Sequence, residues 1–107
     1  LWAGRPPLDC PVRVDVWFIF DRPKSHFGTG RNADVLKPSA PKRMTTPPDV
    51  DKLARTVLDA LTVAGVLADD KLVCELRSLK RYAWPNESGA ATDLMIHWNS
   101  SKTGGAP

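Results

Sequence analysis

The chain has 107 residues, a length suited to one domain with a single core of modest size. Hydrophobic residues make up 42% and charged residues 25%, as in ordinary soluble proteins, and the net charge is +3. No apolar run could cross a bilayer and the start shows no signal-peptide pattern, which excludes a membrane protein and predicts an intracellular one. Cys10 and Cys74 lack partners at zinc-site spacing, so we expect reduced thiols.

The clearest strand pattern lies near the start of the chain, over residues 12–20. Apolar residues occupy every second position there: Val12, Val14, Val16, Phe18 and Phe20. Strict alternation is typical of a strand with one buried face. Trp17 and Ile19 lie on the other face, which suggests that this face is covered as well, at least towards its end.

A long basic loop is expected over residues 21–47. It is rich in proline, contains Gly28 and Gly30, and has no helical or strand periodicity. Six cations stand against two acids, and we take all six as candidate DNA-binding residues: Arg22, Lys24, Arg31, Lys37, Lys42 and Arg43. Such an excess of positive charge favours contact with a polyanion, although a solvated linker has the same composition.

An amphipathic helix is predicted directly after this loop. Pro48 provides no backbone N–H and restricts Pro47 to extended geometry, so the helix can begin only after it. Apolar residues then follow helical spacing, with Leu53, Val57, Leu58, Leu61 and Ala64 on one stripe. Gly65 is placed to end the helix as a left-handed residue.

Carboxylates flank this helix. Asp49 and Asp51 precede it, and they share a side only if the chain is still extended as far as about Asp51. Asp70, in the pair Asp69-Asp70, returns beside them only if the strand order allows it. Carboxylate oxygens suit Mg²⁺, whereas the structural alternative makes these residues helix caps and turn residues. Arg55 lies one turn after Asp51 on the same helical face.

Two further strands are expected, over residues 72–79 and 93–98, separated by a turn-rich segment. Lys80 and Arg81 close the first of them beside Tyr82 and Trp84, a mixture that suits nucleic-acid binding but is also common at sheet edges. Residues 99–107 are expected to form a flexible tail. The order of elements implies an α/β domain in which a small mixed sheet packs against one central amphipathic helix.

Several short motifs along the chain resemble those of the RusA family of Holliday junction resolvases. The similarity runs from Val12 to about Trp98 and rests on PDVDKL (48–53), LDAL (58–61), AGVL (64–67) and DD (69–70), with Val73 after it. It implies a RusA-like fold and a homodimeric, magnesium-dependent endonuclease that resolves four-way DNA junctions by paired symmetric nicks. Mn²⁺ is a possible substitute for Mg²⁺. The three catalytic, metal-binding aspartates of the family fall on Asp49, Asp51 and Asp70, and its functional lysine falls on Arg55.

The resemblance also sets the expected organisation. We expect residues 1–107 to form one RusA-like domain that lacks the N-terminal strand and helix of the family, and that acts in the cytoplasm of a bacterial or phage-infected cell. Lys80 and Arg81 join the loop cations as candidate DNA contacts. Two alternatives remain open: a non-catalytic nucleic-acid-binding module whose aspartates are caps, and an enzyme acting on another phosphate ester.

Overall fold

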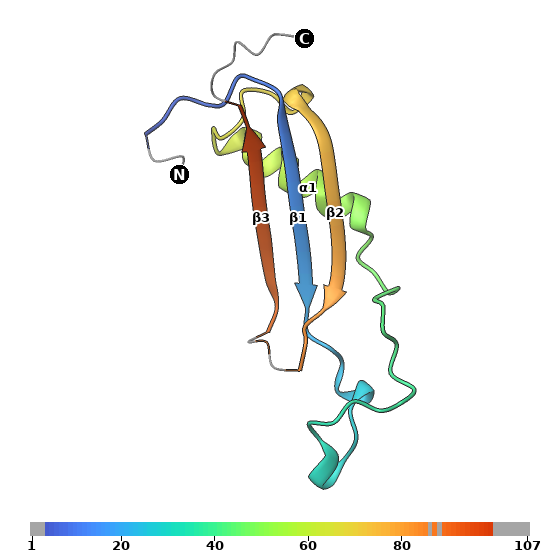
Figure 1. Cartoon of the computed structure of the whole chain (residues 1–107). Helices are drawn as coiled ribbons and strands as arrows, with labels where there is room; N and C mark the ends of the chain where they lie inside the picture. Colours follow the sequence, from blue (N-terminus) through green and yellow to red (C-terminus); the bar gives the residue numbers. More distant parts are fainter. Residues whose placement is uncertain (1–3, 86, 88, 100–107) are drawn as a thin grey trace.

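The computed structural model describes residues 4–85, 87 and 89–99 (Figure 1). Within these residues, three strands form one mixed sheet in the order β2-β1-β3: β1 (Val12–Phe20), β2 (Val73–Tyr82) and β3 (Ala91–Trp98). The central strand β1 pairs parallel with β2 and antiparallel with β3. A parallel neighbour requires a crossover, and the helix α1 (Val50–Val63) provides it by crossing one face of the sheet. This arrangement confirms the predicted α/β class.

The core lies between β1 and the second half of α1. Val14 is fully buried and faces Leu61, and Leu67 after the helix is 1% exposed in the same cluster. In the sheet, Val14 is paired with Leu76 on β2 and with Ile96 on β3. Directly paired residues share a face, so the alternation predicted for β1 is what turns its valines towards the helix.

The predicted apolar stripe of α1 is confirmed. Leu61 is buried, and four neighbours on the stripe are half buried: Leu53, Val57, Leu58 and Ala64. Ala54 is also buried, although a single alanine carries little hydrophobic signal. Gly65 ends the helix at a φ of 80°, and Val66 N–H donates to the Leu61 carbonyl at 2.9 Å. These features form a Schellman motif, which accounts for the glycine at this position.

The face of the sheet opposite α1 is only partly covered. Asp15 and Ile19 are buried there, as expected for a second covered face, but Trp17 is half buried and Met95 is 52% exposed. Asp15 lies 3.3 Å from both the Arg13 guanidinium and the imidazole Nε2 of His97. Arg13 and His97 are the ion-pair partners of the buried Asp15 carboxylate, so His97 has a structural role beside the central strand.

The segment between β1 and α1 extends beyond the end of the sheet (Figure 1). Its regular structure consists of two short 3₁₀ turns, η1 (Lys24–His26) and η2 (Gly30–Asn32), and a bridge between Phe27 and Leu36. A third 3₁₀ turn, η3 (Asp70–Leu72), leads into β2. The tail expected over 99–107 lies outside the described residues from position 100 onward. Among the described residues, no helix has the length and apolarity that a membrane span needs.

Candidate active site and nucleic-acid interface

The segment that enters α1 is attached to the sheet by Lys80, near the end of β2. Its ammonium donates hydrogen bonds to the Thr46 carbonyl at 2.6 Å and to the Pro48 carbonyl at 2.9 Å. The peptide bond between Pro47 and Pro48 is cis. Because both acceptors lie within the three residues before Asp49, the position of the helix start depends on a side chain from β2. The predicted role of Lys80 in DNA binding rests on its charge, and nothing in the local sequence indicates these two acceptors, which lie 34 and 32 residues away.

Asp49 occupies the N-cap position of α1, with extended backbone angles of −74° and 140°, yet its side chain makes no capping hydrogen bond. Its nearest ion-pair partner is the exposed Lys52 ammonium, at 3.8 Å. The helix begins at Val50, so Asp51 lies inside the first turn. The condition that the chain stay extended to about Asp51 is therefore not met. Both carboxylates are exposed, and the structural alternative for Asp49, a side-chain cap, is absent here.

The two residues of the second acidic pair, Asp69 and Asp70, differ in their contacts. The Asp69 carboxylate accepts a hydrogen bond from the Lys71 backbone N–H at 2.9 Å, which lowers the pKa of Asp69 and caps the turn η3. Asp69 is thus a turn residue, as the structural alternative supposed. Asp70 is the first residue of η3 and is exposed.

Asp70 and the helix start lie towards opposite ends of β2. Asp70 precedes the first residue of that strand, whereas Asp49 follows the carbonyl held by Lys80 near its end. At about 3.3 Å per strand residue, this separation is on the order of 20 Å. Within the described part of the chain, no three acidic, histidine or cysteine side chains come close enough to hold a metal ion. One chain therefore does not bring Asp49, Asp51 and Asp70 together.

Arg55 is exposed on α1, one turn beyond Asp51. Among the described residues it has neither an ion pair nor a hydrogen bond, so the expected structural alternative, pairing with Asp51 or Asp59, is not formed. Its guanidinium remains free to meet an anion next to the helix start.

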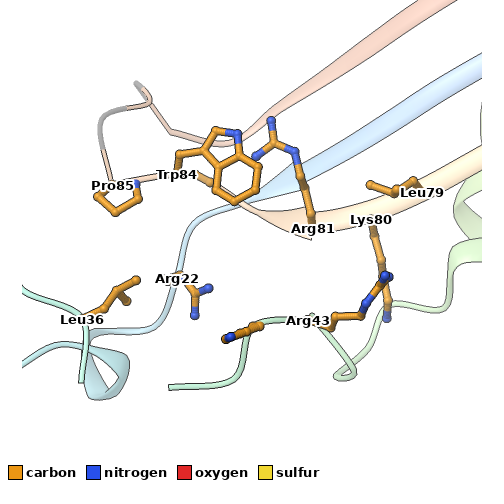
Figure 2. A pocket seen from close by; sticks show the side chains of 10 residues that line it. Arg22, Leu36, Arg43, Leu79, Lys80, Arg81, Trp84 and Pro85 are labelled. Carbon is orange, nitrogen blue, oxygen red and sulfur yellow. The ribbon is translucent and has the colours of Figure 1, made fainter. Parts of the chain in front are cut away.

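A pocket of about 600 Å³ lies between the end of β2 and the basic loop (Figure 2). Ten residues line this basic pocket: Arg22, Leu36, Lys42, Arg43, Leu79, Lys80, Arg81, Ala83, Trp84 and Pro85. Five of the lining residues are cations and none is acidic. The fold thus gathers five of the eight candidate DNA-binding residues. Lys24 and Lys37 line a separate depression, and Arg31 lies in η2.

The cations of the basic pocket differ in whether they already form an ion pair or a hydrogen bond within the protein. Arg81 forms a two-pronged ion pair with Glu87, at 2.7 and 2.8 Å, which lowers the pKa of Glu87 to about 2. Arg22 donates to the Pro41 carbonyl at 2.7 Å. Within the described residues, Lys42 and Arg43 are exposed and have no partner, so they are the cations most available to phosphate.

A mixed sheet crossed by one helix, with exposed carboxylates at the helix start and a cationic pocket beside it, is the arrangement expected of a nucleic-acid-processing α/β domain. A model of the family "Endodeoxyribonuclease RusA" matches residues 2–88. The chain belongs to the RusA endodeoxyribonuclease family, which confirms the family and the endonuclease class expected from the sequence. The match ends before β3. No curated protein and no solved structure matched the chain.

Proposed function

We propose that this endodeoxyribonuclease resolves four-way (Holliday) DNA junctions by paired symmetric nicks, during recombination and repair in the cytoplasm of a bacterial or phage-infected cell. The observation that carries the proposal is the position of Lys80. It lines the basic pocket and also holds the Pro48 carbonyl, next to Asp49. Cations that attract the DNA backbone and carboxylates suited to a cleavage site therefore meet at one point of the fold.

The helix start suits Mg²⁺, with Mn²⁺ as a possible substitute. Magnesium is usually held by one or two carboxylates together with water and substrate phosphate. Asp49 and Asp51 are both exposed at the helix start, so either would supply a carboxylate there, although the chain is not extended as far as Asp51. Bound there, the ion would activate water and offset the charge that develops on the phosphate. Arg55 lies one turn further on and has no partner in the described chain, which supports a role for its guanidinium in orienting a phosphate oxygen.

Asp70 is included in the proposed site because it matches the third catalytic aspartate of the family. Since one chain separates it from Asp49 by on the order of 20 Å, it does not fit a preassembled three-carboxylate site. We propose that the protein works as a homodimer. A junction with two-fold symmetry needs two active sites, which an isologous dimer provides, and in this dimer the second copy would supply Asp70.

The test uses a synthetic four-way junction, incubated with Mg²⁺ or with a chelator. Asp49→Asn, Asp51→Asn and Asp70→Asn should each abolish cleavage, while junction binding persists or tightens because the repulsion between carboxylate and phosphate is relieved. Asp59→Asn is the matched control, since it removes the same charge from an exposed position within α1, away from the helix start. Cleavage close to the parent rate in any of the first three variants removes that residue from the site.

The test also separates this proposal from the non-catalytic alternative. A binding module whose aspartates are structural should bind the junction equally well with Mg²⁺ or chelator and should leave it intact in both. The absence of a capping bond from Asp49 argues against that alternative, because a cap is the role it assigns to this residue.

A further inference from the structure

We propose that the basic pocket is a receptor for one unpaired nucleotide, whose base stacks on Trp84 and whose phosphate binds Lys42 and Arg43. The inference rests on the proposed function for the source of that nucleotide, the branch point of a junction. It goes beyond the proposed function because it identifies the part of the DNA that this pocket binds.

Trp84 is held in place before any ligand arrives. The Arg81 guanidinium carbon lies 4.6 Å from the centroid of its ring, in cation–π geometry. Glu87 fixes that guanidinium through two hydrogen bonds and also accepts the Trp84 backbone N–H at 2.6 Å. The ring nevertheless remains 58% exposed. A tryptophan that is fixed yet more than half exposed offers a surface for stacking, since ordering its side chain costs little on binding.

The walls around Trp84 suit a base better than a duplex. Leu36, Leu79 and Pro85 give the pocket apolar surface, and Leu79 is 39% exposed. A volume of about 600 Å³ lies in the range of small-molecule sites, of roughly 300–1,000 Å³, and cannot hold a stretch of double helix. Base stacking with apolar surroundings is how unpaired nucleotides are bound.

The charge of the pocket selects a nucleotide over a neutral aromatic ligand. No acidic residue lines the pocket, and among the described residues Lys42 and Arg43 have no internal partner. Figure 2 shows Arg43 on the loop side of the pocket, with Trp84 on the opposite side at the end of β2. A ligand between them therefore meets an aromatic ring on one side and unpaired positive charge on the other.

The position of the pocket connects this ligand to the helix start. Lys80 lines the pocket, while its ammonium bonds the carbonyl that precedes Asp49. A strand whose unpaired nucleotide occupies the pocket and which runs back along β2 past Lys80 would lie next to the exposed carboxylates of α1. The pocket would thus fix which phosphodiester lies at the candidate active site.

The base contact is tested with two labelled single-stranded 12-mers, oligothymidylate and an oligomer of abasic sites, in chelator. Fluorescence anisotropy gives the Kd of each. Trp84→Ala should weaken oligothymidylate binding by roughly 5- to 100-fold and leave the abasic 12-mer unchanged, because only the former has bases to stack. Trp84→Tyr, which keeps a ring, should retain most of the affinity. Equal effects on both oligomers, or no effect of Trp84→Ala, overturn the proposal.

The phosphate contact is tested with a pair of variants of equal charge. Lys42→Ala/Arg43→Ala should reduce the salt dependence of binding by about 0.7 in log Kd against log salt, the value for the one single-strand phosphate that the two cations share. Lys24→Ala/Lys37→Ala removes the same charge from exposed loop positions outside the pocket and should change it much less. Equal effects would show that loop charge acts without a defined site. Displacement of oligothymidylate by an equal concentration of an acidic peptide would overturn the assignment to nucleic acid.

These assays need neither metal nor cleavage, so the two proposals can fail separately. A chain that distinguishes the two oligomers through Trp84 but leaves four-way junctions intact with Mg²⁺ contradicts only the proposed resolvase activity. A chain that cuts junctions but binds both oligomers alike contradicts only the nucleotide receptor.

Discussion

Removing the ammonium of Lys80 tests whether this residue positions the helix start or contacts DNA. Lys80→Met keeps most of the length and the apolar stem of the side chain but eliminates the bonds to the Thr46 and Pro48 carbonyls. Hydrogen bonds from charged donors contribute about 1.5–3 kcal/mol each, and less where water competes. Both acceptor residues are exposed and can be rehydrated, so we expect a total loss of about 1–2 kcal/mol.

Two measurements distinguish a positioning role of Lys80 from a DNA contact. Urea unfolding followed by circular dichroism should show a lower midpoint with an unchanged slope, because the folded and unfolded surfaces stay the same. Single-turnover cleavage at saturating protein should slow by tenfold or more, since displacement of the segment before Asp49 misplaces the carboxylates. The salt dependence of junction binding should not change.

A DNA contact gives a different pattern. If the ammonium bound a phosphate, Lys80→Met would reduce the salt slope by about 0.9 and leave cleavage at saturation unaltered. Lys80→Arg would then restore binding, because it keeps the charge. Under the positioning role Lys80→Arg restores little, since a planar guanidinium does not reproduce the two-carbonyl geometry of an ammonium. A smaller salt slope, unaltered cleavage at saturation and restored binding in Lys80→Arg would together refute the positioning role of Lys80.

Three further predictions concern cleavage, stability and pH. Arg55→Ala should slow junction cleavage by about 10²-fold while Arg55→Lys keeps much of the rate, and a parent-like rate for the alanine variant would exclude Arg55 from the site. Leu67→Ala should destabilise the protein by about 3–5 kcal/mol in urea unfolding, because Leu67 is 1% exposed in the core, and a loss below 1 kcal/mol would contradict its burial. The pKa of Glu87 is about 2 against an ordinary 4.5, mainly through Arg81, so its contribution to stability is present above about pH 4.5 and lost as pH falls through 2. A carbon NMR titration of Glu87 with a midpoint near 4.5 would show that the pair does not form.

Local patterns predicted the elements of the fold well. The alternation over residues 12–20 matches β1 to the residue, and Gly65 ends α1 as expected. The last strand begins at Ala91 instead of residue 93, because Ala91 and Thr92 pair with Ile19 and Phe18 although they carry no apolar signal of their own. Pairing with β1, which the local sequence does not encode, extends this strand.

The candidate site was harder to predict, because it depends on contacts between distant segments. The sequence predicts which carboxylates and cations belong to the candidate site, but the distance between Asp70 and Asp49 follows from the parallel pairing of β2 with β1. The acceptors of Lys80 lie 32 and 34 residues away in the chain. Trp84 looked like an edge aromatic, and only the contacts of Arg81 and Glu87 reveal that its ring is held in place.

The order of the strands also has a consequence for how the protein folds. β2 and β3 are neighbours in the chain but not in the sheet, because β1 lies between them. Val12 pairs with both Val73 and Trp98, so each pairing among the three described strands closes a long loop. None of these pairings is a hairpin of adjacent strands that could form first and nucleate the sheet. Until β1 is inserted, both of its partners expose unpaired edges that another chain could extend. Folding speed and protection from aggregation therefore depend on one event, the insertion of β1.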